Sequence, residues 1–290
     1  MTELAFLGTG TMGMPMARNL LAAGFSLRVW NRSAERAQPL AGDGAKVCAQ
    51  AAEAARAAEL LVTMLSDGDA VHAVAEQALP ELGTDAIWIQ MSTIGIEASA
   101  RCAELAAQAG VTLVDAPVLG TREPAEQAKL VVLASGPEET HDTVAPVFDA
   151  VGSRTLWVGE AGAASRAKVV VNGWVVGIVG VLAEVITLAE GLDLDPSLFF
   201  ESVKGGPLDL PYARLKGRAM IEHDFDDASF RLALSRKDGD LLLAAAHRVG
   251  LQLPVMDAIV ARMRKAEADG HGDEDMAATY WAGAPAGTRR

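Results

Sequence analysis

The sequence predicts an α/β domain built on a mostly parallel sheet, followed by an all-helical domain that a long helix joins to it. Two observations lead to this fold class. Through the first half, short β-rich runs alternate with alanine-rich helical stretches, which is typical of parallel strands joined by crossover helices. Beyond about residue 160, helical periodicity continues and no further convincing strand follows. We therefore expect domains at residues 1–162 and 163–290.

The expected strands are short apolar or β-branched runs bounded by turn-forming residues. They are Leu4–Leu7, Ser26–Trp30, Leu60–Leu65, Ala86–Met91, Thr112–Asp115 and Val131–Ser135. The helices expected between them are Met12–Ala23, Ser33–Ala41, Ala49–Ala57, Asp69–Ala78 and Ile96–Ala109. Gly24 and Gly110 stand where helices must end before strands, as C-terminal glycine caps do. In the second half we expect helices at about Ala163–Glu190, Pro196–Val203, Tyr212–Glu222, Ser229–Val249 and Pro254–Asp269.

Composition argues against several classes of partner. The 38 acidic and 25 basic residues give a formal net charge of −13, which repels nucleic-acid phosphates and anionic lipid surfaces. Two cysteines and five histidines show no paired spacing, so we expect neither disulfides nor a metal site. No export signal is visible, and the apolar run Val169–Ala183 is too short to span a bilayer. A cytoplasmic protein follows as the expectation.

A glycine-rich loop follows the first expected strand. The segment Gly8-Thr9-Gly10-Thr11-Met12-Gly13 reads G-x-G-x-x-G between an apolar strand and an amphipathic helix. In a dinucleotide site, Gly8 allows the tight turn, Gly10 leaves room for the pyrophosphate and Gly13 lets the helix pack closely. The helix start, with Thr11 and Met12, offers free N–H groups to phosphate. The alternative is a purely structural strand–turn–helix. The context favours a Rossmann domain that binds a dinucleotide.

The residues after the second strand indicate which dinucleotide is bound. NAD enzymes usually carry Asp or Glu there to bind the ribose hydroxyls, whereas this chain has Asn31-Arg32-Ser33. Arg32 can clamp a 2′-phosphate, and Asn31 and Ser33 can donate hydrogen bonds to it. Arg32 as a solvated loop arginine is the alternative. We expect NADP in preference to NAD.

Lys168 and Asn172 share one face of the long joining helix, because they lie four residues apart in a run of Val, Ala and Gly. Lys168 must therefore either extend its amine to water or face a polar cleft. In a cleft, its ammonium can stabilise the charge that builds on a carbonyl oxygen during hydride transfer and then donate a proton. Asn172 can hold the amine or a substrate hydroxyl, or it can satisfy a neighbouring backbone group.

Five further motifs follow the glycine loop along the chain. They are Val62-Thr63-Met64-Leu65, Met91-Ser92-Thr93-Ile94, Lys168 with Asn172 as K-x-x-x-N, Lys237-Asp238, and Gly270-His271-Gly272-Asp273-Glu274-Asp275 as G-x-G-x-x-D. Together with the glycine loop they resemble the β-hydroxyacid dehydrogenase family, which includes 3-hydroxyisobutyrate dehydrogenases and glyoxylate/succinic semialdehyde reductases. The resemblance implies that Met64, Leu65, Ser92, Thr93 and Lys237 lie along the cofactor. It also implies a catalytic Lys168, small hydroxy acids or their aldehydes as substrates, and a homodimer or homotetramer.

The expected substrate loop departs from the family pattern. The family reads D-A-P-V-S-G-G, whereas this chain has Asp115-Ala116-Pro117-Val118-Leu119-Gly120-Thr121. Leu119 removes a hydroxyl donor and adds an apolar side chain, while Thr121 partly restores a donor. Trp174 can wall the pocket or belong to the core. We expect Leu119, Gly120, Thr121 and Trp174 to bind a substrate that is longer or less polar than the family norm.

Three other functions fit parts of the sequence. Imine reductases share this architecture but usually lack a lysine at the position of Lys168. A non-catalytic NADP-binding protein is the second alternative, against which Lys168 and Lys237 both argue. A phosphosugar acid dehydrogenase is the weakest, because only a few basic groups of the helical domain, including Lys204, Arg214 and Lys216, are available for a phosphate.

Overall fold

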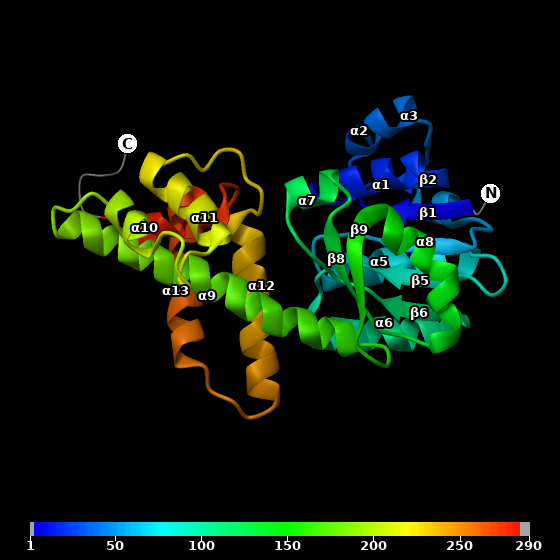
Figure 1. Cartoon of the computed structure of the whole chain (residues 1–290). Helices are drawn as coiled ribbons and strands as arrows, with labels where there is room; N and C mark the ends of the chain where they lie inside the picture. Colours follow the sequence, from blue (N-terminus) through cyan, green and yellow to red (C-terminus); the bar gives the residue numbers. More distant parts are fainter. Residues whose placement is uncertain (1–2, 285–290) are drawn as a thin grey trace. The chain divides into compact units, whose positions relative to one another are not determined.

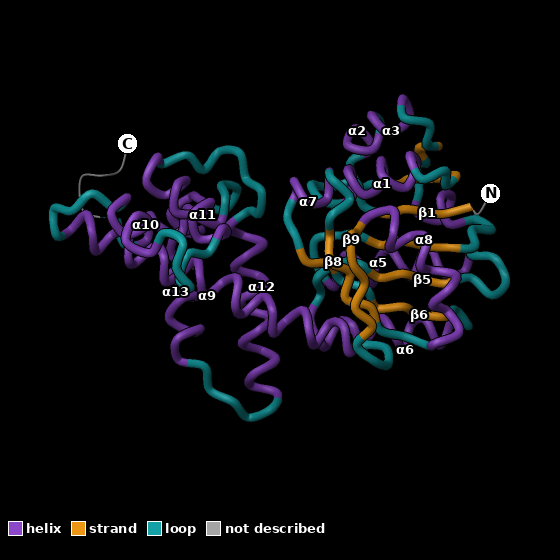
Figure 2. Tube along the Cα trace, in the orientation of Figure 1, coloured by secondary structure: helices purple, strands orange, loops and turns teal. Residues whose placement is uncertain are grey.

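The computed structural model describes residues 3–284 of the chain. They form two compact units that divide between Lys168 and Val169. The first unit contains every strand of the described chain, and the second is entirely helical, as Figure 2 shows by colour. The predicted fold class, an α/β domain followed by a helical one, is confirmed.

The first unit is built on a six-stranded sheet in the order β3-β2-β1-β4-β5-β6, and all five pairings are parallel. Its strands are β1 (Glu3–Leu7), β2 (Ser26–Trp30), β3 (Lys46–Val47), β4 (Leu60–Thr63), β5 (Ile87–Gln90) and β6 (Thr112–Asp115). This is the strand order of the Rossmann fold. It places the carboxyl ends of all six strands at one edge, where such sheets bind ligands.

Helices cover both faces of this sheet (Figure 1). They are α1 (Gly13–Ala22), α2 (Ala34–Ala37), α3 (Pro39–Gly42), α4 (Ala51–Ala55), α5 (Gly68–Ala78), a 3₁₀ turn η1 (Leu79–Glu81), α6 (Gly95–Ala109) and α8 (His141–Val151). Gly110 adopts a left-handed conformation after α6 with φ 69°, and Gly24 follows α1 with φ 91°. The two predicted glycine caps are therefore confirmed.

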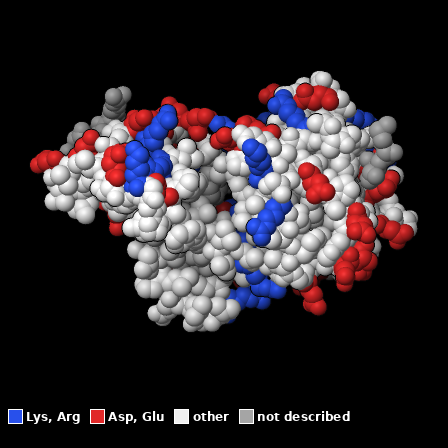
Figure 3. All heavy atoms as spheres, viewed as in Figure 1, with Lys and Arg blue, Asp and Glu red and all other residues white. Residues whose placement is uncertain are grey.

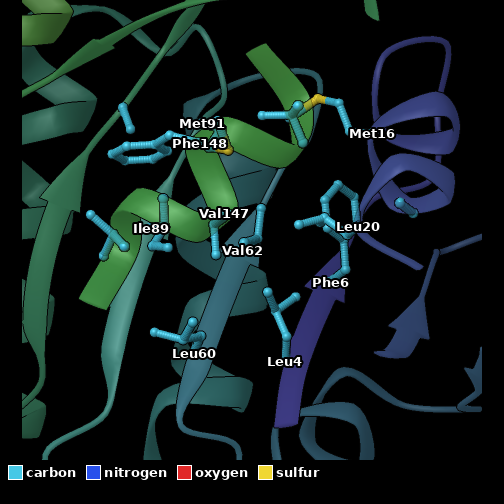
Figure 4. Packing of buried hydrophobic residues seen from close by; sticks show 14 of the residues in the cluster. Leu4, Phe6, Met16, Leu20, Leu60, Val62, Ile89, Met91, Val147 and Phe148 are labelled. Atoms are coloured by element: carbon cyan, nitrogen blue, oxygen red, sulfur yellow. The ribbon is translucent and has the colours of Figure 1, made fainter. Parts of the chain in front are cut away.

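Side chains along the central strands alternate between two cores, because successive residues of a strand point to opposite faces. Leu4 and Phe6 of β1 pack with residues of α1 and α8, as Figure 4 shows around Leu20 and Val147. Ala5 and Leu7 of the same strand belong to the other core, with residues of α4, α5 and α6. Burial on both faces explains why these parallel strands read as continuous apolar runs.

A second, three-stranded sheet completes the first unit, and the sequence predicted it only in part. It consists of β7 (Val118–Leu119), β8 (Leu130–Ala134) and β9 (Gly152–Trp157), with α7 (Arg122–Glu126) between β7 and β8 and a 3₁₀ turn η2 (Glu138–Thr140) before α8. Strand β8 matches the expected Val131–Ser135. The strands β3, β7 and β9 and the helices α7 and α8 were missed. β3 and β7 have only two residues each, too few to show a period.

The long helix α9 (Ala163–Gly191) runs from the first unit into the second. The apolar run Val169–Ala183 is part of this longer helix. The apolar part of the helix is therefore longer than the 15 residues counted from the sequence. By length and composition alone α9 could cross a membrane, but half of its most apolar window is buried inside the protein. Core helices of soluble proteins meet the same criterion, so the helix is weak evidence for a membrane protein.

The second unit packs several helices around a single core. Its elements are the rest of α9, α10 (Ser197–Val203), α11 (Pro211–Glu222), α12 (Leu232–Arg248), α13 (Pro254–Ala266), a π-helical turn η3 (Glu267–His271) and a 3₁₀ segment η4 (Met276–Ala282). Val179, Ile186, Met263 and Tyr280 are fully buried in this core. On the face drawn in Figure 3, acidic side chains occur on both units, and basic ones lie in separate small groups.

Candidate active site

The glycine loop has a different backbone constraint at each of its three glycines. Gly8 has φ 107°, and a Cβ there would stand 2.2 Å from the Met64 carbonyl oxygen. A Cβ on Gly13 would stand 1.9 Å from the Gly8 carbonyl oxygen, so only glycine lets α1 start this close to β1. A Cβ on Gly10 would meet no atom within 4 Å. Gly10 therefore borders open space, which suits a loop that accommodates a pyrophosphate.

Asn31 at the end of β2 holds this loop in place. Its Oδ1 accepts a hydrogen bond from Thr9 N at 3.1 Å, and its Nδ2 donates to Ser33 O at 2.9 Å. The side chain predicted to bind a 2′-phosphate thus also fastens the loop after β1 to the loop after β2. Thr11 and Met12 lie at the start of α1, where no side chain caps the helix. Met14 N donates to Gly10 O and Pro15 has no N–H, so the N–H groups left for an anion are that of Gly13 and those of the loop before it.

Arg32 and Ser33 are exposed next to this loop. Within residues 3–284, the guanidinium of Arg32 makes no hydrogen bond or ion pair. Ser33 precedes α2 without capping it through its side chain. No carboxylate occupies the end of β2, so the groups there can accept the additional negative charge of a 2′-phosphate.

The segments after β4 and β5 are tied together by Ser92. Its hydroxyl accepts a hydrogen bond from Leu65 N at 2.8 Å and donates to Thr63 O at 3.3 Å. Ser92 is fully buried, so the structure gives this residue a positioning task within the protein. Met64, Leu65 and Thr93 are half-buried beside it, at the same sheet edge as the glycine loop.

Asp115 at the end of β6 fixes the start of α9. Its two carboxylate oxygens accept hydrogen bonds from Ser165 N at 2.8 Å and from Ser165 Oγ at 3.0 Å, while Ser135 Oγ accepts from Ala164 N at 3.0 Å. These bonds satisfy N–H groups that the first turn of a helix leaves free. Burial raises the pKa of Asp115, and the bonds from Ser165 oppose that rise. Sequence reasoning placed Asp115 in the substrate loop and missed this role.

Lys168 lies one helical turn after Ser165 and is only 9% exposed. Asn172 follows on the same face of α9, also buried, and its Nδ2 donates to Asp238 Oδ2 at 2.7 Å. Asp238 belongs to α12, and its Oδ1 is 3.1 Å from the amine of its neighbour Lys237. The structure therefore joins two of the expected motifs, K-x-x-x-N and Lys237-Asp238, through the Asp238 carboxylate, to which the sequence analysis assigned no role.

The segment expected to bind the substrate lies between β7 and α7. Leu119 ends β7 and Thr121 precedes α7, both half-buried, with Gly120 between them at φ 129°. Trp174 does not join Lys168 and Asn172: it is 66% exposed. Two residues along a helix is a rotation of about 200°, so Trp174 and Asn172 point to nearly opposite sides. Trp174 is therefore not a core residue of this chain, and the expectation that it walls the substrate pocket stays a prediction.

Other chemistries find little support among the described residues. Lys216, a candidate for phosphate binding, is 2% exposed and paired with Asp275. Arg214 pairs with Asp209, and Lys204 pairs with Glu201. Burial and the charge of Asp115 raise the pKa of Cys102 to about 12, which keeps this thiol protonated. No group of three metal-ligating side chains occurs in residues 3–284.

Comparison with known proteins agrees with this geometry. The family model of the NAD-binding domain of 6-phosphogluconate dehydrogenase matches residues 3–159, and that of the NAD-binding domain of NADP-dependent 3-hydroxyisobutyrate dehydrogenase matches residues 162–282. The chain is 35% identical over 95% of its length to an uncharacterized Bacillus subtilis oxidoreductase, YfjR, of which it covers 98%. It is 32% identical over 95% of its length to the chloroplastic glyoxylate/succinic semialdehyde reductase 2 of Arabidopsis thaliana, of which it covers 78%.

A solved structure extends the likeness to three dimensions. The 3-hydroxyisobutyrate dehydrogenase of Mycobacterium tuberculosis, solved with L-serine, superimposes with a TM-score of 0.87 at 29% identity. The alignment covers 97% of this chain and 98% of that one. The glycine loop and the parallel sheet fit a dinucleotide, and both family models describe NAD-binding domains. The chain therefore belongs to the β-hydroxyacid dehydrogenase family and is an NAD(P)-dependent oxidoreductase.

Proposed function

We propose that this enzyme is an NADP-dependent reductase of small aldehydes and oxo acids, with the reverse oxidation of hydroxy acids, and that Lys168 is its general acid/base. One observation carries the proposal. Asp115 holds the first turn of α9 at the carboxyl end of β6, the edge that also bears the glycine loop and the segments after β4 and β5. A buried amine one turn further along α9 is thereby tied to the edge of the sheet that binds the cofactor.

The chemistry follows from that placement. When bound, the reduced nicotinamide supplies hydride to the carbonyl carbon. Lys168 Nζ then stabilises the negative charge on the substrate oxygen and donates the proton that completes the alcohol. Asn172, held by Asp238, orients the amine or the substrate oxygen, and Lys237 contributes positive charge to cofactor binding. Lys168 is itself only 9% exposed, which limits the competition of bulk water for the proton.

A spectrophotometric screen tests the proposed function. NADPH and NADH oxidation should be followed with glyoxylate, succinic semialdehyde, longer and bulkier aldehydes, and a cyclic imine. We expect turnover of aldehydes that is faster with NADPH than with NADH. Turnover of the imine alone would show that the enzyme is an imine reductase. An inactive protein that still binds NADPH would show that the chain is a non-catalytic binding protein.

Gly10→Ala distinguishes a cofactor loop from a structural turn. Because a Cβ at Gly10 meets nothing within 4 Å, we expect the melting temperature to stay within about 2 °C of the wild type. The added methyl group would occupy the space of the pyrophosphate, so the Kd for NADPH should rise by about 10-fold or more. Gly13→Ala is the contrasting variant, since its Cβ collides with the Gly8 carbonyl and should lower the melting temperature as well. Unchanged NADPH affinity in Gly10→Ala would refute the proposed contact.

Leu119 is proposed to set the substrate preference, with Gly120 and Thr121 completing the loop. An apolar side chain replaces a hydroxyl donor there, so the pocket should favour longer or less polar carbonyl compounds over glyoxylate. In Leu119→Ser, kcat/KM for glyoxylate should rise by about 10-fold relative to that for a bulkier aldehyde, because a charge-assisted hydrogen bond to the carboxylate is regained. Leu119→Ala is the matched control, which adds space without a donor. If the wild type already turns over glyoxylate and succinic semialdehyde equally and gains nothing with bulkier aldehydes, the proposal fails.

We further propose that the chain works in the cytoplasm as a homodimer or homotetramer. The exposed side of α9 carries an apolar stripe at helical spacing: Val170, Trp174, Val181 and Leu188 are each more than half exposed. Apolar side chains that repeat along one helix face usually pack against another helix. This stripe supports association of α9 with a second copy of the chain, and Trp174 would then serve an interface.

A further inference from the structure

A buried ion pair lies at the centre of the second unit. Lys216 of α11 is 2% exposed, and its Nζ lies 2.7 and 2.8 Å from the two carboxylate oxygens of Asp275. The same amine donates to Ser229 Oγ at 2.9 Å. Burial lowers the pKa of Lys216, and the Asp275 carboxylate opposes that shift. Asp275 is the last residue of the G-x-G-x-x-D motif, to which the proposed reaction assigns no task.

Asp275 accepts hydrogen bonds from backbone N–H groups as well as from Lys216. Its Oδ2 receives hydrogen bonds from Ser229 N at 3.0 Å and Phe230 N at 3.3 Å, and its Oδ1 receives one from Ala277 N at 3.0 Å. Ser229 and Phe230 form the turn that leads into α12. One carboxylate therefore fixes the backbone immediately before this helix.

The rest of the motif caps the helix itself. The first N–H groups of α12 have no partner inside the helix, and here they donate to backbone carbonyls of the motif. Leu232 N donates to Glu274 O at 2.8 Å, and Ala233 N donates to Gly272 O at 3.0 Å. Met276 N in turn donates to Phe230 O at 2.8 Å, so the two segments bind each other in both directions.

Helix α12 carries two groups of the proposed site shortly after this start. Lys237 and Asp238 come five and six residues after Leu232, within two helical turns. Asp238 holds Asn172 through the 2.7 Å bond described above. A shift of the first turn of α12 would therefore be transmitted along a rigid helix to both side chains.

We propose that Asp275 is a positioning residue: its carboxylate sets the start of α12 and thereby the places of Lys237 and Asp238, while Lys216 compensates the buried charge. This inference rests on the proposed function for the tasks of Lys237 and Asp238. It gives the G-x-G-x-x-D motif a physical role, because the backbone of the motif caps the helix and its aspartate fixes the preceding turn. The inference assigns different roles to the two partners of the ion pair: the Asp275 carboxylate positions α12, and the Lys216 ammonium does not.

Two single variants of the full-length enzyme test this division. In Asp275→Asn, one of the two acceptor oxygens becomes an NH2 group, so the donors around the two oxygens can no longer all be accepted in either orientation of the amide. We expect the Kd for NADPH to rise by about 10-fold and kcat/KM to fall by about 100-fold, as misplaced site residues require. In Lys216→Met, Asp275 keeps its backbone donors. There kcat/KM should change by less than about 3-fold, even though the melting temperature falls as well.

Hydrogen exchange gives a readout that does not depend on catalysis. Peptides covering the start of α12 should exchange faster in Asp275→Asn than in Lys216→Met at the same temperature interval below each melting temperature. Asp275→Glu keeps both charges and moves the acceptor oxygens by one methylene group, so it tests the same point should Asp275→Asn not fold. We expect it to lower kcat/KM by about 10-fold with little loss of thermal stability.

Parallel losses would overturn the inference. If the activities of Asp275→Asn and Lys216→Met fall together, in proportion to their melting temperatures, the pair is only structural. Wild-type activity in Asp275→Asn or Asp275→Glu would have the same consequence. Failure of the proposed function is recognised separately, because full aldehyde reduction by a Lys168 variant leaves the NADPH-binding and exchange comparisons intact.

Discussion

Lys168→Met is expected to lower kcat for aldehyde reduction by about 1,000-fold or more while NADPH still binds. The variant keeps the aliphatic length of the side chain and removes the ammonium. A positioned general acid typically contributes about 10² to 10⁴ in rate, and stabilisation of charge on the substrate oxygen adds to this. Because methionine suits a buried helix position, the melting temperature should fall little or rise. The loss should therefore appear in kcat rather than in the amount of folded enzyme.

Arg166→Met is the matched control for that variant. Arg166 is exposed and lies two residues before Lys168 in α9, and its substitution by methionine removes the same single positive charge. Its kcat should stay within about 3-fold of the wild type, since exposed charges contribute little at such sites. Stopped-flow measurement of NADPH oxidation, together with NADPH binding by fluorescence, separates the chemical step from cofactor affinity. A Lys168→Met enzyme that reduces aldehydes at more than about a tenth of the wild-type rate would remove Lys168 from the mechanism.

The fold was predictable because its determinants are local. The run Leu4–Leu7, the glycine loop and the cap at Gly110 each show their pattern within a few residues, and the structure has all three. Strand β9 was not predicted, because Gly152–Trp157 mixes polar and apolar residues without alternation in burial. Helix α8, which precedes β9, was missed because it contains Pro146, a residue that disfavours a helix interior.

The candidate site was predictable only where function resides in a motif. Gly10, Arg32 and Lys168 stand out because their residue types suit phosphate binding and proton transfer at fixed spacing. The groups that position them do not stand out: Asp115 meets Ser165 across 50 residues, and Asn172 meets Asp238 across 66. No local pattern records such a pairing, since it depends on how distant elements pack. Trp174 shows the same limit, because closeness in sequence to Asn172 does not place its side chain on the same face of the helix.

Arg32→Glu is expected to reverse the choice of cofactor. The exposed guanidinium next to the glycine loop can bind a 2′-phosphate by charge-assisted hydrogen bonds, which contribute about 1.5–3 kcal/mol each. A glutamate removes these bonds and adds repulsion against the phosphate, while it can accept hydrogen bonds from the ribose hydroxyls of NADH. We expect the KM for NADPH to rise by about 100-fold and that for NADH to stay equal or fall. The ratio of kcat/KM values for the two cofactors reports the change.

Salt and a remote charge reversal decide whether Arg32 acts directly. Arg154→Glu makes the same change in net charge at an exposed position of β9, so its effect should be small and should disappear at high salt. In Arg32→Glu, the selectivity should remain reversed at high ionic strength, because hydrogen bonds to the phosphate are lost as well as long-range attraction. Equal increases in the KM values for NADPH and NADH would mean that Arg32 is a solvated loop arginine. The cofactor preference would then have to come from another group at the end of β2.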